Sequence, residues 1–154
     1  MLLEIILITL GILFVLDLFL PPLVAFFYTG FKTPSSSFAP PLSVIIPVRN
    51  EQLIIGRTIE SWLALDYPSQ IEILIVDSGS QDRTSQIVKE FARKHANVYF
   101  YEISSHNKLN TVVYGVKKSN FEYLVISDAD RLPSPYGLPE LVKHIEKKDI
   151  GAVF

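Results

Sequence analysis

From residue 42 onward, short apolar runs alternate with segments in which apolar residues recur every three or four positions. The runs are rich in β-branched and aromatic residues, which is typical of strands, and they cover residues 42–47, 71–77, 97–102, 122–128 and 150–154. Helical spacing appears between them, within residues 55–63, 87–92 and 109–116. Strands and helices that alternate in this way form βαβ units, so the sequence predicts an α/β fold with a mostly parallel sheet.

The N-terminus has a different pattern, because residues 5–28 are almost entirely apolar and carry one charge, Asp17. About twenty apolar residues cross a bilayer as a helix, so we expect a transmembrane anchor within residues 1–31. Two features oppose this interpretation. A carboxylate in mid-membrane costs about 2.5–3.5 kcal/mol on insertion scales, and the pair Pro21–Pro22 interrupts a helix.

Residues 32–41 are rich in proline and serine, which predicts a linker between the anchor and a domain over residues 42–154. The nearest positive charge, Lys32, follows the apolar segment. Positive residues favour the cytoplasmic side, so we expect a single-pass membrane protein with a cytoplasmic domain.

Composition narrows the classes of function. The 154 residues are enough for about one domain. The net charge of −2 is unlike that of a nucleic-acid-binding protein, which normally has a basic patch. The chain has no cysteine, and this excludes disulfides, thiolate metal sites and a cysteine nucleophile.

Polar residues stand directly after the first four predicted strands, within residues 47–51, 77–82, 103–108 and 128–131. Open parallel sheets bind ligands at the carboxyl ends of their strands. These polar groups are therefore expected to meet at one edge of the sheet and to form a binding site there.

Two of these segments offer carboxylates for a nucleoside. Asp77 ends a buried strand, where it could accept hydrogen bonds from a base imide or a ribose hydroxyl. Glu51 could do the same, although Asn50 and Glu51 would equally suit the start of the following helix. Asp82 stands where a helix should begin, so helix capping is as good an explanation as ligand contact.

The other two segments carry the charges that a diphosphate would need. Lys108 is at a predicted helix start, where a cation opposes the helix dipole unless an anion docks there, although a solvated surface lysine is the alternative. Asp128 and Asp130 are two positions apart after the fourth strand, so in an extended segment both point the same way. Aspartates are common in turns, but two convergent carboxylates suit Mg²⁺ or Mn²⁺.

Three segments together, "PLSVIIPVRNE", "IEILIVDSGSQDRT" and "EYLVISDAD", resemble the N-terminal half of a family 2 glycosyltransferase with a GT-A fold, over about residues 42–154. The resemblance implies a nucleotide-diphosphate-sugar donor linked to UDP or GDP, a metal ion, and transfer to a lipid-linked or polysaccharide acceptor at the membrane. An alternative is a truncated or split module that binds the nucleotide sugar without catalysis and needs a partner polypeptide.

The resemblance also implies roles for individual residues. Lys108 would lie near the nucleotide, Asp128 would approach the ribose and diphosphate, and Asp130 would hold the metal. The pocket for the base and ribose would be lined by Pro47, Glu51 and Asp77.

The chain departs from the family pattern at several points. Ser78 stands where the family usually has a second aspartate, which removes one contact to the base. Asn107 and Val113 replace a usual glycine and asparagine around Lys108. The acceptor-activating base of inverting members lies downstream of the paired aspartates, and no residue of this chain is expected to fill that role.

Overall fold

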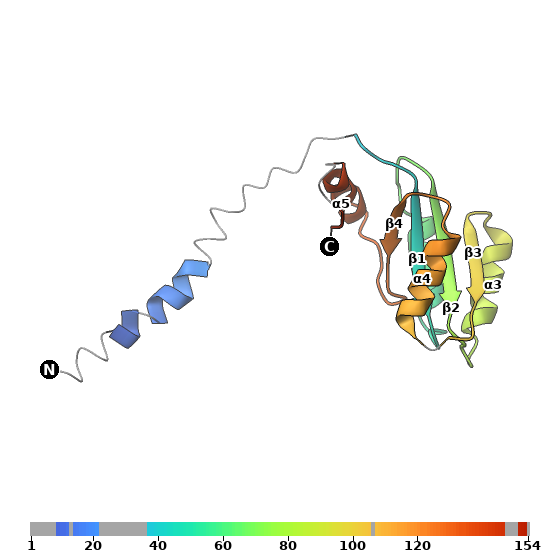
Figure 1. Ribbon diagram of the computed structural model, residues 1–154, viewed down its shortest axis with the longest axis horizontal. Coiled ribbons are helices and arrows are strands. Elements are labelled where there is room, and N and C mark those ends of the chain that lie inside the picture. Colours follow the sequence, from blue (N-terminus) through green and yellow to red (C-terminus); the bar gives the residue numbers. More distant parts are fainter. Residues whose placement is uncertain (1–8, 13, 22–36, 106, 147–150, 154) are drawn as a thin grey trace. The chain divides into compact units, whose positions relative to one another are not determined.

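The computed structural model describes residues 9–12, 14–21, 37–105, 107–146 and 151–153 (Figure 1). The chain divides into two compact units, Met1–Pro34 and Ser35–Phe154. The predicted domain therefore lies within the second unit, and the predicted membrane anchor within the first.

The first unit is helical at residues 9–12 and 14–21. Within the part of it that the structure describes, no helix is both long and apolar enough to cross a membrane. The prediction of a single-pass membrane chain is contradicted by this finding. The rest of the predicted anchor (residues 1–8, 13 and 22–31) lies outside the described residues.

The second unit contains a four-stranded, fully parallel sheet with the order β3-β2-β1-β4 (Figure 1). Its strands are β1 (Leu42–Val48), β2 (Ile71–Asp77), β3 (Val98–Glu102) and β4 (Tyr123–Ile126). The predicted α/β fold with a parallel sheet is confirmed. The predicted fifth strand is wrong for residues 151–153, which have no regular structure, and residues 150 and 154 lie outside the described residues.

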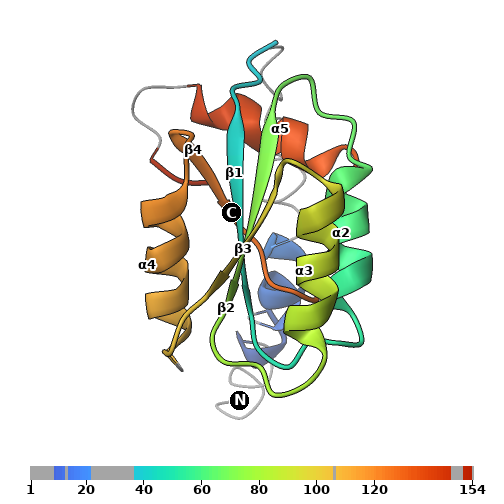
Figure 2. The same cartoon turned by 90° about the vertical axis from the view of Figure 1, so that its right-hand side faces the viewer.

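Four helices accompany the sheet: α2 (Ile55–Leu63), α3 (Thr84–Lys94), α4 (Lys108–Lys118) and α5 (Gly137–Ile145). Figure 2 shows α4 on one face of the sheet and α2 with α3 on the other. Helices α2 and α3 cover a continuous apolar core on one face of the sheet. Helix α4 lies on the opposite face, against β1 and β2.

Successive side chains of β1 and β2 point to opposite faces of the sheet, so these two strands contribute buried apolar residues to both faces. On one face, fully buried side chains of the strands form a core with those of α2 and α3. The strands contribute Val44, Ile46, Ile73 and Ile75, and the helices contribute Ile55, Ile59 and Val88. On the other face, Gly115 of α4 lies so close to the sheet that a Cβ atom there would be 2.5 Å from Cγ2 of Ile45. A glycine is therefore needed at position 115 for α4 to rest at this height.

A buried carboxylate organises the amino end of the sheet. Glu72 is 4% exposed, and its Oε1 accepts hydrogen bonds from Ser43 Oγ at 2.5 Å and from the Asn120 amide at 2.7 Å. Its Oε2 accepts from Asn120 Nδ2 at 2.7 Å. Because these donors come from β1 and from the turn before β4, Glu72 fixes the starts of three neighbouring strands.

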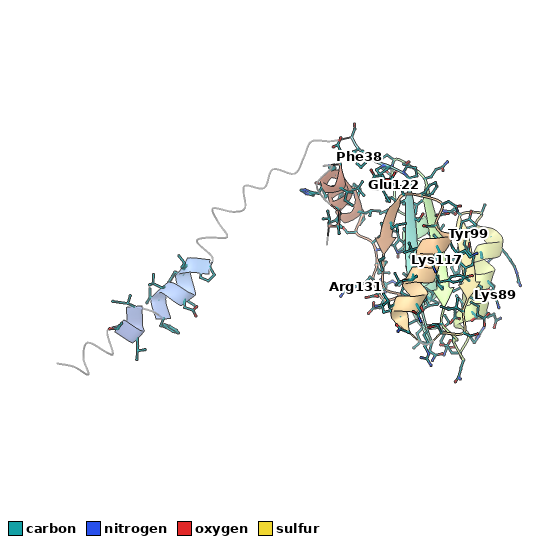
Figure 3. All side chains as sticks on the ribbon, viewed as in Figure 1. Phe38, Lys89, Tyr99, Lys117, Glu122 and Arg131 are labelled. Carbon is teal, nitrogen blue, oxygen red and sulfur yellow. The ribbon has the colours of Figure 1, made fainter. Side chains whose placement is uncertain are left out.

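The end of the predicted linker contacts the domain. Phe38 packs edge-to-face on Tyr123 with ring centroids 5.6 Å apart, and Figure 3 shows it at the same end of the domain as Glu122. The Tyr67 hydroxyl donates to the Pro40 carbonyl at 2.8 Å, and burial raises the pKa of Tyr67 to about 12. Residues 37–41 form no helix or strand, but Phe38 and Pro40 contact these side chains. Residues 32–36 lie outside the described residues.

Candidate functional site

A cavity of about 360 Å³ opens at the carboxyl edge of the sheet. It is lined by Pro47, Val48, Arg49, Glu51, Ser78, Lys108, Thr111, Asp128, Ala129 and Asp130. The parallel register explains why these segments meet, since Val48 at the end of β1 lies opposite Asp77 at the end of β2. The structure thus brings together five of the residues singled out from the sequence, and the sixth, Asp77, is not among the lining residues.

One wall of the cavity is the loop after β1, which is joined to the loop after β2 by reciprocal hydrogen bonds. The Asn50 backbone N–H donates to Ser80 Oγ at 2.9 Å, and the Gln81 backbone N–H donates to Asn50 Oδ1 at 2.8 Å. The Glu51 amide donates to Thr84 Oγ1 at 2.8 Å. Asn50 adopts a positive φ of 58°, a conformation that asparagine tolerates better than most residues. These contacts fix the backbone at Asn50 and Glu51, directly after Arg49.

The N-cap of α3 is Arg83, without a side-chain capping hydrogen bond, so Asp82 stands one residue before the cap. Its Oδ1 accepts from the Thr84 amide at 2.9 Å and the Thr84 hydroxyl at 2.5 Å, at the start of α3. Its Oδ2 accepts from the Gln52 amide at 3.2 Å. Desolvation acts to raise the pKa of Asp82, but the hydrogen bonds from Thr84 and Gln52 outweigh it and lower this pKa below its usual value. Asp82 therefore joins the two loops and is not among the lining residues.

Asp77 is fully buried beneath this junction. Its Oδ1 accepts from both the amide and the hydroxyl of Ser80, each at 2.8 Å, and its Oδ2 accepts from the Ser85 hydroxyl. Both carboxylate oxygens thus have protein donors. Ser80 Oγ in turn accepts from the Asn50 amide, so Asp77 is connected to the cavity wall through one hydroxyl. Direct contact between Asp77 and a base or ribose stays a prediction.

The opposite wall carries an ion pair. Lys108 Nζ lies 2.5 Å from Asp128 Oδ1, and the two side chains are 66% and 47% exposed. Asn107 caps α4 by accepting from the Leu109 amide at 2.8 Å, which places Lys108 in the first helical position. An exposed ion pair contributes only about 0–1 kcal/mol to stability, so Asp128 can exchange Lys108 for another cation at small cost.

The paired aspartates stand on a short turn after β4. The Ser127 amide still donates to the Ile45 carbonyl at 3.0 Å, and the Arg131 amide then closes the turn on the Asp128 carbonyl at 3.1 Å. Ala129 between them is buried in the core, whereas Asp130 is exposed. Both carboxylates line the cavity, although they stand on a turn and not in the extended segment from which their common direction was predicted.

The donor groups fit a divalent cation that arrives with phosphate. Within the described ranges, no group of three or more His, Cys, Asp or Glu side chains could hold a metal alone. Mg²⁺ is typically bound by one or two carboxylates, with phosphate oxygens completing its coordination. The lining residues include two cations and three carboxylates, so a diphosphate would meet a net negative site unless a metal ion accompanied it.

Five lining residues were not predicted as site residues: Val48, Arg49, Ser78, Thr111 and Ala129. Arg49 had a usable signal, since it is a cation two positions before Glu51 and directly after the first strand. Thr111 lies one turn before Gly115 on α4, and that glycine, which lets the helix rest close to the sheet, was the available signal in the sequence.

Comparisons with known proteins identify the family. The family model described as Glycosyl transferase family 2 matches residues 43–154. The chain belongs to this family. The membership confirms the resemblance seen in the sequence motifs, and the matched region includes all four strands except the first residue of β1.

Curated relatives include enzymes that build glycans. The chain is 34% identical over 95 residues to a dolichyl N-acetyl-α-D-glucosaminyl phosphate 3-β-D-2,3-diacetamido-2,3-dideoxy-β-D-glucuronosyltransferase of Methanococcus voltae, covering 60% of this chain and 30% of the relative. It is 33% identical over 115 residues to a poly-β-1,6-N-acetyl-D-glucosamine synthase of Staphylococcus epidermidis, covering 73% and 27%. The chain thus spans less than a third of the length of either relative.

Solved structures show the same fold. A mannosyltransferase from Pyrobaculum calidifontis in complex with GDP-Man and Mn²⁺ matches with a TM-score of 0.72 and 25% identity, covering 91% of this chain and 44% of the other. Residues 1–349 of S. aureus TarS with UDP-GlcNAc match with a TM-score of 0.58 and 24% identity, covering 68% and 31%. These matches support the predicted GT-A type of α/β fold.

Proposed function

We propose that this chain is the donor-binding part of a glycosyltransferase that takes a sugar from a UDP- or GDP-linked donor with the help of a divalent metal ion. The proposal rests chiefly on one observation. A single cavity at the carboxyl edge of the sheet brings together Lys108, Asp128 and Asp130 with Glu51. Family membership and the nucleotide-sugar complexes of the structural neighbours support it.

The residues divide the work by their chemistry. Glu51 accepts hydrogen bonds from the ribose or base, while Arg49 and Lys108 offer positive charge to the diphosphate. Asp130, with Asp128 beside it, holds Mg²⁺ or Mn²⁺, which when bound neutralises charge on the departing diphosphate. Pro47 and Ser78 line the same cavity, and Asp77 supports its wall from beneath.

The acceptor is proposed to be a lipid-linked sugar or a growing polysaccharide. The name of the Methanococcus voltae relative includes a dolichyl N-acetyl-α-D-glucosaminyl phosphate, and that of the Staphylococcus epidermidis relative specifies a polysaccharide product. A comparison of sugar transfer to a polyprenyl-phosphate sugar and to a short oligosaccharide by the protein would separate the two acceptors.

Calorimetric titration with UDP and with GDP, each with and without Mn²⁺, tests the donor site. We expect one of the two nucleotides to bind in a Mn²⁺-dependent manner, and we expect Asp130→Asn to remove that dependence. Asp66→Asn is the matched control, because Asp66 is an exposed aspartate that does not line the cavity. Heat unchanged in Asp130→Asn would exclude the metal role, and no heat from either nucleotide would refute the donor site.

A second candidate is a binding module that needs a partner polypeptide for catalysis. The carboxylates that line the cavity favour it, because all three of them, Glu51, Asp128 and Asp130, are assigned to the nucleotide or the metal, and none is left to activate an acceptor. Glu140, a carboxylate of α5, is not among the lining residues, and its Oε1 pairs with Lys143 Nζ at 2.6 Å. Sugar transfer from UDP-GlcNAc or GDP-mannose by this chain alone would exclude the binding module, whereas binding without transfer would support it.

A further inference from the structure

The turn that carries the paired aspartates is held by a residue of α2 that is 71 positions away in sequence. Thr58 is fully buried, and its Oγ1 donates to the Ala129 carbonyl at 2.5 Å. A threonine within a helix commonly returns its hydroxyl to the carbonyl four residues earlier. Here that alternative, the Ile54 carbonyl, is 3.3 Å away. The shorter contact therefore leaves the helix and reaches the aspartate turn.

This contact bears on the position of both carboxylates. The carbonyl of Ala129 belongs to the planar peptide group that joins it to Asp130, so fixing its oxygen fixes the orientation of that plane and the direction of Asp130. The methyl group of Ala129 is also buried, which leaves the turn little freedom to rotate. The neighbouring aspartates thus stand on a backbone that is pinned between them.

The same helix is attached to the other wall of the cavity. The Ile54 and Ile55 amides donate to the Glu51 carbonyl at 3.1 and 3.0 Å. One turn later, Thr58 reaches Ala129. Since Ile55 and Ile59 are completely buried in the core, α2 is a rigid spacer between the wall that carries Glu51 and the turn that carries Asp130.

We propose that Thr58 is a positioning residue, whose hydroxyl sets the geometry of Asp128 and Asp130 for a metal–nucleotide complex. The metal part of this inference rests on the proposed function. Residues that orient metal ligands through hydrogen bonds change metal affinity by about 10–100-fold when mutated. Thr58 is not among the residues that line the cavity, so its effect is expected in the metal-dependent part of binding.

The test compares Thr58→Val, which keeps the shape and loses the hydroxyl, with Thr58→Ser, which keeps the hydroxyl. Mn²⁺ is titrated into each full-length protein with saturating UDP or GDP, and nucleotide binding is also measured without metal. We expect Thr58→Val to weaken Mn²⁺ about 10-fold or more, and Thr58→Ser to stay close to wild type. Metal-free nucleotide affinity is expected to be unchanged in both.

Ser43→Ala is the matched control for a loss of stability. Ser43 is fully buried and donates to Glu72 at 2.5 Å, at the amino end of the sheet. Ser43→Ala should lower the melting temperature of the protein without weakening its affinity for Mn²⁺. Equal weakening in Ser43→Ala and Thr58→Val would overturn the inference, as would wild-type affinity in Thr58→Val or a defect in Thr58→Ser as large as that of Thr58→Val.

A measurement without ligand separates this inference from the proposed function. The Arg131 amide closes the aspartate turn, so its hydrogen exchange, followed by NMR, reports on the turn directly. We expect faster exchange in Thr58→Val but not in Ser43→Ala, and unchanged exchange would overturn the positioning role. If wild-type protein bound no metal–nucleotide complex, the proposed function would fail, while faster Arg131 exchange would still support the pinning of the turn by Thr58.

Discussion

Strand β2 has a buried carboxylate at each end, and the two have similar surroundings but different consequences. Glu72 at the amino end accepts hydrogen bonds from Ser43 and Asn120. Asp77 at the carboxyl end accepts from Ser80 and Ser85. Each satisfies both of its oxygens with nearby amides, hydroxyls or side-chain amides, as buried polar groups must.

The difference lies in what the donors belong to. The donors of Glu72 come from β1 and the turn before β4, so they hold strands together. Ser80, the main donor to Asp77, also receives the Asn50 amide from the loop that lines the cavity. The same chemistry therefore supports stability at one end of the strand, and both stability and the shape of the site at the other.

The largest effect is expected from Asp77→Ala. Removing a buried carboxylate that accepts three hydrogen bonds should lower the free energy of unfolding by about 3 kcal/mol. Nucleotide affinity should also fall, by about tenfold, which corresponds to about 1.4 kcal/mol of lost positioning. Urea denaturation and calorimetry measure the two effects.

Asp77→Asn is the informative companion to that change. An asparagine can still accept from Ser80 and can donate to Ser85, so it should keep most of the stability and the binding. If Asp77→Asn lost nucleotide binding while remaining stable, direct contact between the charged carboxylate and the ligand would be the better explanation.

Glu72→Ala is expected to have a smaller effect, and one on stability alone. We expect a loss of about 2 kcal/mol in the free energy of unfolding, since the buried Ser43 hydroxyl loses its acceptor whereas Asn120, the other donor, is exposed and can bond to water. Nucleotide affinity, measured where the variant is fully folded, should equal that of wild type. Weaker binding in this variant would remove the contrast between the two ends of β2.

Gly115→Ala tests packing in the middle of the sheet, away from both carboxylates. The new methyl group would lie 2.5 Å from Ile45 Cγ2, so α4 would have to move. Overpacking costs about 1–3 kcal/mol, and the better helix propensity of alanine offsets about 1 kcal/mol. A net loss of about 1 kcal/mol in urea denaturation is expected, and no loss would show that α4 moves easily.

The smallest effect concerns pH. The pKa of Asp82 is lowered in the folded protein, so its contribution to stability is complete above the unfolded pKa and is lost as pH falls through the folded pKa. Asp82→Asn should therefore flatten the loss of stability below about pH 4 relative to wild type. Thermal unfolding at a series of acidic pH values measures this, and parallel curves for the two proteins would contradict the role of Asp82 at the loop junction.

Most of the fold could be predicted from the sequence because its periodicities are strong. The apolar runs of β1 and β2 and the helical spacing of α2 to α4 agree with the observed elements. The predicted strand at residues 150–154 was a run of small and apolar residues, "IGAVF", and such short runs adopt strand geometry only where a neighbouring strand pairs with them. The membrane anchor predicted from the apolar N-terminal segment was contradicted, because no helix among the described residues is long and apolar enough to cross a membrane.

The site was predictable at the level of strand ends but not of hydrogen bonds. Position after a strand was enough to bring Glu51, Lys108 and Asp130 to one cavity. It could not reveal that Asp77 is enclosed by Ser80 and Ser85, because serines three and eight residues later carry no distinctive signal. Nor could it reveal Thr58, whose partner is 71 residues away.

The contacts of Phe38 and Pro40 have a practical consequence for anyone trimming this protein for crystallisation. A version that began at Leu42, the first residue of β1, would strip the aromatic cover from Tyr123 and leave the Tyr67 hydroxyl without its acceptor. A boundary placed at about residue 37 keeps both contacts.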